Sequence, residues 1–285
     1  MHHNCFVRGL TAKFAVRYLL VDSTAIAQVA QDRHKLDTGA ATICAEAISA
    51  SILLASQIKG DERITVQLQT EHPNINFICD ISAQGKVRAK LTPTTLNKIP
   101  KRLNGAILVI KHNASKELYR GVTMIENKSI AQALQHHLQQ STQIDTFIRI
   151  SSTFDRNNQI SSSIGILLER LPPTPDLPYL DTEQFNEKYD QLLTMEHAAL
   201  LSSLQEDKLM DSQLHSLETR ELEWQCRCSR EKVLAVLFSL GPTEIQAMIE
   251  EDGKAEVSCH FCNTITQISK QELEGLLADH TNRKQ

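Results

Sequence analysis

The stretch CRCSREKVLAVLFSLGPTEIQAMIEEDGKAEVSCHFCN, residues 226–263, places a pair of cysteines near each of its ends. The pair Cys226 and Cys228 has one intervening residue, the pair Cys259 and Cys262 has two, and thirty residues separate the pairs. Four thiolates grouped in this way can supply the closed tetrahedral sulfur site of a structural zinc ion. The spacing therefore predicts that these four cysteines bind one metal ion, and that the metal is zinc.

The residues around the two pairs predict a compact unit of short elements. Ser229 is placed to cap a helix that ends at Gly241, and Thr243 is expected to begin a second helix that ends at Gly253. The run AEVSCHFCNTITQIS then reads as two strands joined by the turn that carries the second cysteine pair, and a capping box at Ser269 begins a last helix, KQELEGLLADH. About sixty residues with so small a core need an additional cross-link, which a metal would provide.

The single residue between Cys226 and Cys228 adds a redox hypothesis. A disulfide across this pair closes a small, strained ring, and strained exposed disulfides are labile and regulatory. Nearby Arg227, Arg230 and Lys232 are expected to offset the two net negative charges of a zinc tetrathiolate. The site can thus be metal-bound when reduced and disulfide-bonded after peroxide attack. Because metal-binding energy is folding energy in a small domain, oxidation is expected to expel the metal and unfold the unit.

The other three cysteines, one histidine and the tryptophan are given structural interpretations. Cys44 and Cys79 fall in apolar patterns and are expected to be small core residues, whereas Cys5 is expected at the surface. His260 is interpreted as a solvent-facing turn residue. Trp224, the only tryptophan, is interpreted as packing for the zinc unit.

The N-terminal half predicts an α+β domain with mostly antiparallel strands. Helices are expected over residues 24–58, where TGAATICAEAISASILLASQIKG is apolar nearly all round and therefore expected to be buried. Ile64, Val66 and Leu68 alternate with polar residues, as in a half-buried strand. Further strands are expected at 74–82, 106–111, 117–125, 145–151 and 160–171, with a helix at 129–141.

An acidic segment follows the proline run LPPTPDLPYL at 171–180, which indicates a domain boundary. Between Pro175 and Gln225, twelve acidic residues stand against three basic ones, and helical apolar spacing continues through 181–205. Such helices depend on packing against another surface. The predicted organisation is an N-terminal α+β core at 1–174, an acidic helical linker at 175–222 and a small C-terminal zinc-binding domain at 223–285.

Composition and motif searches exclude several classes of protein. With 41% hydrophobic and 22% charged residues, the chain has the composition of a globular protein and not of a disordered one. The apolar stretch 41–55 is interpreted as too short to cross a membrane, and the N-terminus shows no export signal. Phosphate-binding and hydrolase motifs are missing, which argues against an ATP-driven machine.

Two rival functions remain at this point. A thiol oxidoreductase could use CHFC at 259–262, although the strand-to-helix setting of such motifs is not predicted here. A zinc-ribbon nucleic-acid protein could use the basic stretch from Lys86 to Arg102, although no aromatic residue is interleaved there and the net charge is −4. Catalytic turnover of a disulfide substrate would support the first rival, and salt-dependent nucleic-acid affinity the second.

The same stretch 226–263 resembles the redox switch of the 33 kDa heat-shock chaperone family, bacterial holdases that act without ATP. GDERITVQLQ (60–69), LYRGVTMIE (118–126) and QSTQIDTFIRIS (140–151) resemble the N-terminal domain of that family. The resemblance implies a non-enzymatic cytoplasmic chaperone for unfolded or oxidatively damaged clients, with neither nucleic acid nor membrane as a partner.

For the cysteines, the resemblance implies one zinc per chain, held by Cys226, Cys228, Cys259 and Cys262 in the reduced, inactive state. It further implies that oxidation forms the disulfides Cys226–Cys228 and Cys259–Cys262, releases zinc and activates the chaperone. A redox-sensitive middle linker and a homodimer upon activation are also implied.

Overall fold

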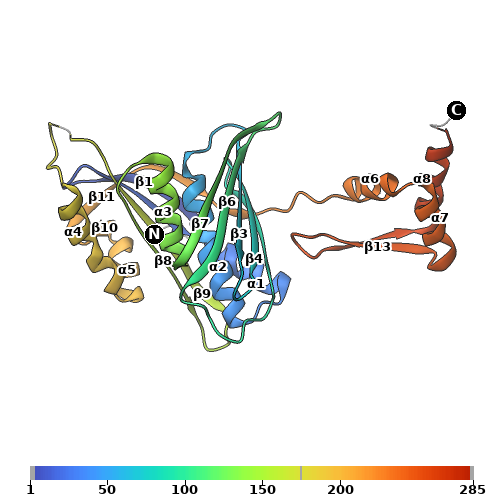
Figure 1. The fold of residues 1–285 in the computed structure, drawn as a ribbon, viewed down its shortest axis with the longest axis horizontal. Helices are drawn as coiled ribbons and strands as arrows, with labels where there is room; N and C mark the ends of the chain where they lie inside the picture. The colour runs from blue at the N-terminus through green and yellow to red at the C-terminus, as the bar shows by residue number, and fades with distance from the viewer. Residues whose placement is uncertain (1–3, 174, 283–285) are drawn as a thin grey trace. The chain divides into compact units, whose positions relative to one another are not determined.

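The structure is a computed structural model that describes residues 4–173 and 175–282 (Figure 1). The chain forms two compact units, Met1–Gln225 and Cys226–Gln285, and each is considered by itself. The larger unit contains two six-stranded sheets with helices, and the smaller one contains a hairpin with three helices, counting described residues only. The predicted α+β class with mostly antiparallel strands is confirmed.

Two sheets make up the framework of the larger unit. The first sheet is antiparallel throughout and runs, in spatial order, β10 (Lys208–Leu209), β11 (Ser212–Glu221), β1 (Cys5–Thr11), β2 (Val16–Asp22), β9 (Ile160–Arg170) and β8 (Thr146–Phe154). The second sheet runs β12 (Glu223–Trp224), β5 (Lys86–Thr92), β4 (Asn76–Ser82), β3 (Arg63–Thr70), β6 (Leu103–His112) and β7 (Glu117–Lys128). In this second sheet only the short β12–β5 pair is parallel among the described strands.

Helices fill the space between the sheets and cover one outer face. Among the described residues of this unit, the helices are α1 (Thr24–His34), α2 (Thr38–Leu54), α3 (Ile130–Thr142), α4 (Thr182–Thr194) and α5 (His197–Gln205), and η1 (Ala55–Gln57) is a 3₁₀ turn. Helix α2 contacts strands of both sheets and belongs to the main core, together with residues of α1 and α3 (Figure 1). Helices α4 and α5 pack with the opposite face of the first sheet in a second core.

Helix α2 is buried as its all-round apolar pattern predicts. The Asp37 side chain caps its first turn by accepting from the Ala40 amide at 2.8 Å. The continuous helical stretch Thr38–Gln57 is long and apolar enough to cross a membrane, so the interpretation of this region as too short was wrong. Within the protein, 83% of its most apolar window is buried, and its composition is accounted for by its place between two sheets.

Strands β1 and β2 were not predicted, although both are central to the first sheet. Strand β2 has core residues on both faces: Leu19 and Val21 face the main core, while Tyr18 and Leu20 face the second core. A strand buried on both faces shows a continuous apolar run, and its period cannot be distinguished from that of a buried helix.

The acidic segment is helical over α4 and α5, as expected, but then differs from the expectation. Residues 212–221 form strand β11, which pairs with β1 from Cys5↔Glu221 to Thr11↔Leu214. Its side chains are mostly exposed, so it lacks the apolar alternation that marks a half-buried strand. The chain from the proline run to Gln225 thus belongs to the larger unit, to which it contributes two helices and the strands β10, β11 and β12.

The smaller unit follows the local signals closely. Its elements are α6 (Arg230–Leu240), α7 (Pro242–Glu251), β13 (Lys254–Ser258), β14 (Ile265–Ser269) and α8 (Lys270–Asn282). The Ser229 side chain caps α6, and Gly241, at φ 94°, ends it. The prediction for Thr243 was wrong, because α7 begins at Pro242, whose fixed φ suits the first helical position. The Glu272 carboxylate accepts from the backbone amide and hydroxyl of Ser269 at 2.9 and 2.8 Å.

Candidate metal centre

The two cysteine pairs come from two different kinds of local structure. Cys226 and Cys228 lie in the extended segment between β12 and α6, just before the Ser229 cap. Cys259 and Cys262 lie in the connection of the β13–β14 hairpin, which Cys259 closes by donating its amide to Thr264 O at 3.0 Å. The CHFC segment is therefore part of a hairpin connection, not the start of a helix as in thiol oxidoreductases of the thioredoxin type.

Folding brings the four sulfur atoms into one cluster. The Sγ atoms of Cys226, Cys228, Cys259 and Cys262 all lie within 4.8 Å of one another. The closest approaches join the two segments, with 3.5 Å between Cys226 Sγ and Cys259 Sγ and 3.5 Å between Cys228 Sγ and Cys262 Sγ. All four are free thiols.

This cluster is compatible with zinc. A tetrahedral zinc tetrathiolate has Zn–S bonds of about 2.3 Å, which places its sulfur atoms about 3.8 Å apart. The observed separations of 3.5 to 4.8 Å bracket that value without requiring the segments to be rearranged. Sulfur-only donor sets of this geometry are typical of zinc and of iron–sulfur centres.

The electrostatics of the cluster show why a cation would stabilise it. Burial raises the pKa of Cys259, although hydrogen bonds from the amides of Cys262 and Phe261 oppose this effect. Burial, followed by hydrogen bonds to the neighbouring thiols, also raises the pKa of Cys228. For Cys262, burial is outweighed by hydrogen bonds from Thr264 and from the thiols of Cys228 and Cys259, and the pKa falls to about 6. Without a cation, the thiols therefore do not all ionise together.

Some neighbours of the cluster were predicted and one was missed. Of the expected basic residues, Lys232 donates to the backbone oxygen of Arg227 at 2.7 Å. Arg230 instead pairs with Glu272 at 2.7 Å, which ties α6 to α8. The hydroxyl of Thr264 lies 3.2 Å from Cys262 Sγ. Its only sequence signal was a hydroxyl two residues after a predicted ligand.

The other three cysteines lie in the core of the larger unit. Cys44 and Cys79 are buried on α2 and β4 as expected, and burial raises the pKa of Cys44 to about 12 and that of Cys79 well above its usual value. The expectation for Cys5 was wrong, because its side chain is 1% exposed in β1, where burial raises the pKa to about 11. Thiols of this kind are rarely ionised and react slowly.

Trp224 was assigned to the wrong unit. It lies in β12, beside Val87 of β5, and its ring packs against the main core with its centroid 6.5 Å from that of His34. The pairing joins residues that are far apart in the sequence, and no local pattern shows it. His260 is exposed in the hairpin connection, as interpreted.

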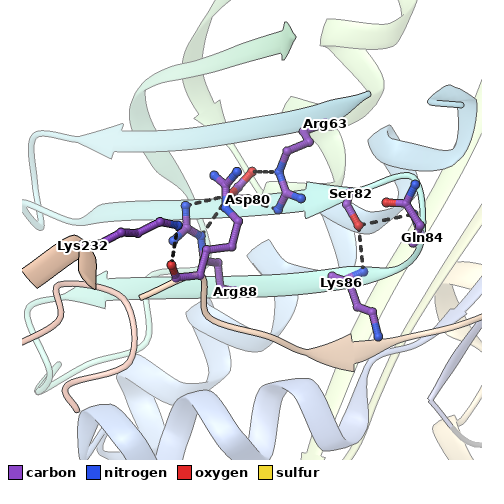
Figure 2. A network of polar contacts seen from close by, with 8 residues as sticks. Arg63, Asp80, Ser82, Gln84, Lys86, Arg88 and Lys232 are labelled. Atoms are coloured by element: carbon purple, nitrogen blue, oxygen red, sulfur yellow. Dashed lines mark hydrogen bonds and ion pairs between the residues drawn. The ribbon is translucent and has the colours of Figure 1, made fainter. Parts of the chain in front are cut away.

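The basic stretch Lys86–Arg102 is partly neutralised by acidic neighbours. The buried carboxylate of Asp80 accepts from Arg63 on one side and from Arg88 on the other, at 3.2 and 2.8 Å (Figure 2). Lys86 pairs with Glu223. These contacts agree with the interpretation of the stretch as a strand with its flanking loop.

The acidic helices contact the larger unit through a defined apolar face. Phe185, Tyr189 and Leu192 of α4 and Leu200 and Leu204 of α5 are buried in the second core. At the C-terminal end of α4, the main-chain oxygens of Leu192 and Met195 accept hydrogen bonds from Arg149 of β8, the latter at 2.6 Å. The surface on which this segment depends is thus the outer face of the first sheet.

Comparisons with known proteins agree over nearly the whole chain. The family model described as Hsp33 protein matches residues 4–269. The "33 kDa chaperonin" of Bacillus subtilis (strain 168) is 27% identical, with 97% of this chain and 99% of the relative covered. The protein of the same name from Staphylococcus haemolyticus is 28% identical, with 98% and 99% covered.

A solved structure has the same fold. The crystal structure of a 33 kDa chaperonin, a heat shock protein 33 homolog from Thermotoga maritima, superposes with a TM-score of 0.81 at 21% identity. The superposition covers 99% of this chain and all of that one.

The fold, the four-cysteine unit and these matches define a molecular chaperone, a class of proteins whose clients are unfolded polypeptides. Within that class, the chain belongs to the Hsp33 family.

Proposed function

We propose that the protein is an ATP-independent holdase whose activity depends on the oxidation state of Cys226, Cys228, Cys259 and Cys262. The single observation that supports this most is the convergence of the four sulfur atoms, all within 4.8 Å of one another, from two separate segments. The reduced, zinc-loaded form is inactive. The oxidised form protects unfolding and oxidatively damaged proteins from aggregation.

In the reduced state, the four thiolates hold one zinc ion per chain. Bound zinc supplies a cross-link between the Cys226–Cys228 segment and the β13–β14 hairpin. The buried apolar core of this unit consists of few residues: Leu237, Ile245, Ala255, Ile268 and Leu273. So small a core needs the cross-link to remain folded.

In the oxidised state, the cysteines form the disulfides Cys226–Cys228 and Cys259–Cys262. Each disulfide forms when a pair of thiolates gives two electrons to one hydrogen peroxide molecule, which takes up two protons from solvent and is reduced to two water molecules. Two peroxide molecules therefore account for both disulfides, and the site loses all four thiolate ligands and with them its zinc.

Which cysteines pair as disulfides determines whether oxidation unfolds the smaller unit. Disulfides between Cys226 and Cys259 or between Cys228 and Cys262 would replace the metal as a cross-link between the two segments. Disulfides within each segment remove that cross-link, because they close loops of only one and two intervening residues. We therefore propose local pairing as the feature that makes oxidation an activating step.

The signal then passes to the linker at 175–222, between a chaperone core at 1–174 and the switch domain, which was predicted at 223–285 and is compact from Cys226 onward. Helices α4 and α5 of the linker cover one face of the core sheet, so their release would expose apolar surface to clients. We place the protein in the reducing cytoplasm, where thiols persist, and propose that the activated form is a homodimer. No enzymatic step is required.

The test compares zinc content and suppression of client aggregation before and after peroxide treatment of the full chain. The proposal predicts weak suppression by the reduced, zinc-loaded protein and strong suppression after oxidation, with loss of one zinc per chain. Cys79→Ala is the matched control, because this buried thiol lies outside the cluster and its loss leaves the response unchanged. Full activity in the reduced, zinc-loaded protein would refute the switch.

A further inference from the structure

The four residues before the cluster occupy the open edge of the second sheet. This segment, Leu222–Gln225, is here called the plug. Its backbone amides donate to main-chain oxygens. Leu222 N donates to Asn4 O at 2.9 Å, Glu223 N to Gly85 O at 3.0 Å and Gln225 N to Val87 O at 2.9 Å. From Glu223 onward, the plug is thus an added parallel strand on β5.

The side chains of the plug alternate in the manner of a recognition strand. Leu222 is buried in the main core and Trp224 packs against it, while Glu223 and Gln225 are exposed. The edge of β5 that the plug covers, here called the slot, therefore accepts an extended segment with an apolar, polar, apolar order of side chains. Strand addition at a sheet edge recognises extended peptides in this way, through main-chain bonds and pockets for alternate side chains.

The slot has definite ends. At one end, the backbone at Glu221 approaches the β4–β5 turn so closely that a Cβ on Gly85 would lie 2.0 Å from Glu221 O. At the other end, His34 of α1 lies 3.1 Å from the next outward carbonyl, that of Ala89, and so closes the edge. An extended segment of about four residues fits between them.

The plug fills this slot imperfectly. Its strand is only two residues long, and the buried indole Nε1 of Trp224 has no hydrogen-bond partner among the residues that the structure describes. An unpaired buried donor weakens the hold of the segment that carries it. The plug also runs directly into Cys226, so it is covalently continuous with the first two thiols of the cluster.

We propose that the edge of β5 from Gly85 to Ala89 is a client-binding site, which the plug occupies in the reduced protein and an extended client segment occupies after activation. The client segment takes the place of Leu222–Gln225, adds a strand to β5 and inserts apolar side chains where Leu222 and Trp224 lie. This inference rests on the proposed function, since it requires that loss of the cluster frees the plug.

Amide hydrogen exchange of the full chain tests the site in three states: reduced with zinc, oxidised, and oxidised with carboxymethylated α-lactalbumin as an unfolded client. The backbone amide of Val87, which faces the plug in the parallel pair, should be protected in the first state, exchange at least about tenfold faster in the second and regain protection in the third. Trp224, the only tryptophan, should shift its fluorescence to longer wavelength on oxidation. Protection that is kept on oxidation, or lost and not regained with client, would overturn the proposal.

A pair of variants tests the plug without oxidation. Trp224→Ala removes the main apolar anchor of the plug, and Leu217→Ala, a 68% exposed apolar position on β11, is the control. In reduced, zinc-loaded protein, a fluorescent peptide with the order Leu-Glu-Phe-Gln should bind Trp224→Ala at least about tenfold more tightly than the wild type. Leu217→Ala should match the wild type. Equal affinity for all three proteins would contradict the proposal.

The proposed function and the proposed client site can be refuted separately. If the oxidised wild type does not suppress aggregation, the proposed function fails and this inference with it. If it suppresses aggregation while the Val87 amide still exchanges freely with client present, clients bind elsewhere and only this inference fails.

Discussion

The two units use the same residue type in opposite ways. Cys44 and Cys79 are buried in a core that spans two sheets and three helices, Cys5 is buried in β1, and burial raises the pKa of each thiol. The four cysteines of the smaller unit gather around one point, and its apolar core is small. The larger unit is thus held together by an extensive apolar core, whereas the smaller unit has few buried apolar residues and gathers its thiols at one point.

The largest difference in stability between the two units is expected when the metal is removed. Structural zinc contributes on the order of 10–16 kcal/mol to folding in small domains, more than the whole stability of a typical domain. A chelator under reducing conditions is therefore expected to unfold Cys226–Gln285 and to leave the sheets of the larger unit intact. Hydrogen exchange measures both at once, and unchanged protection of α6 to α8 without metal would contradict the contrast.

Substituting one cysteine in each unit should show the same difference between a metal ligand and a core residue. Cys259→Ser removes one of four ligands and is expected to lower zinc affinity by more than about 100-fold, since even outer-shell changes cost 10–100-fold. Cys79→Ala is expected to lower the free energy of unfolding of the larger unit by about 1 kcal/mol and to leave zinc binding unchanged. Competition with a zinc chelator and denaturant unfolding check these outcomes; equal zinc affinities would sink the assignment.

The linker offers a test with two neighbouring leucines. Leu192 of α4 is fully buried against the first sheet, while Leu193 is 59% exposed. Leu192→Ala should lower the free energy of unfolding by about 2–5 kcal/mol and increase client binding before oxidation, whereas Leu193→Ala should change stability by about 0.5 kcal/mol at most. Urea unfolding and aggregation assays measure both effects, and similar behaviour of the two variants would show that α4 is not held by this face.

A smaller effect concerns an acidic residue in the apolar part of the larger unit. The carboxyl of Glu46 on α2 lines a cavity of about 240 Å³ with mostly apolar neighbours, and desolvation raises its pKa to about 7. The folded state therefore holds this proton more tightly than the unfolded state, and its contribution is present at low pH and lost as pH rises through 7.

Glu46→Gln removes that dependence. The variant should be about 1–3 kcal/mol more stable than the wild type at pH 8, with the difference vanishing toward pH 4. Denaturant unfolding of the larger unit at several pH values measures this effect, while zinc binding by the smaller unit serves as the unchanged control. A constant difference across pH would place the ionisation elsewhere.

Local signals predicted local structure well. Ser229 and Gly241 delimit α6, and Ile64, Val66 and Leu68 face the core from β3, because caps and alternation act within a few residues. The four cysteines could be predicted as a cluster for the same reason, since thiolate spacing is itself the signal.

Long-range pairing could not be predicted in this way. Strand β11 lies in an acidic, mostly exposed segment and is specified by its partner β1, about two hundred residues earlier. Trp224 likewise seemed to belong with the adjacent cysteines, whereas its pairing with β5 places it in the larger unit. In both cases tertiary contacts override the local pattern.

The central claim is that one cluster of sulfur atoms serves first as a metal site and then as two local disulfides. The most direct measurement follows zinc release and disulfide connectivity together during peroxide treatment of the reduced, zinc-loaded chain, by a zinc-sensitive dye and by peptide mass spectrometry. One zinc per chain is expected to be released as Cys226–Cys228 and Cys259–Cys262 form. Disulfides that join the two segments, or oxidation without zinc release, would contradict it.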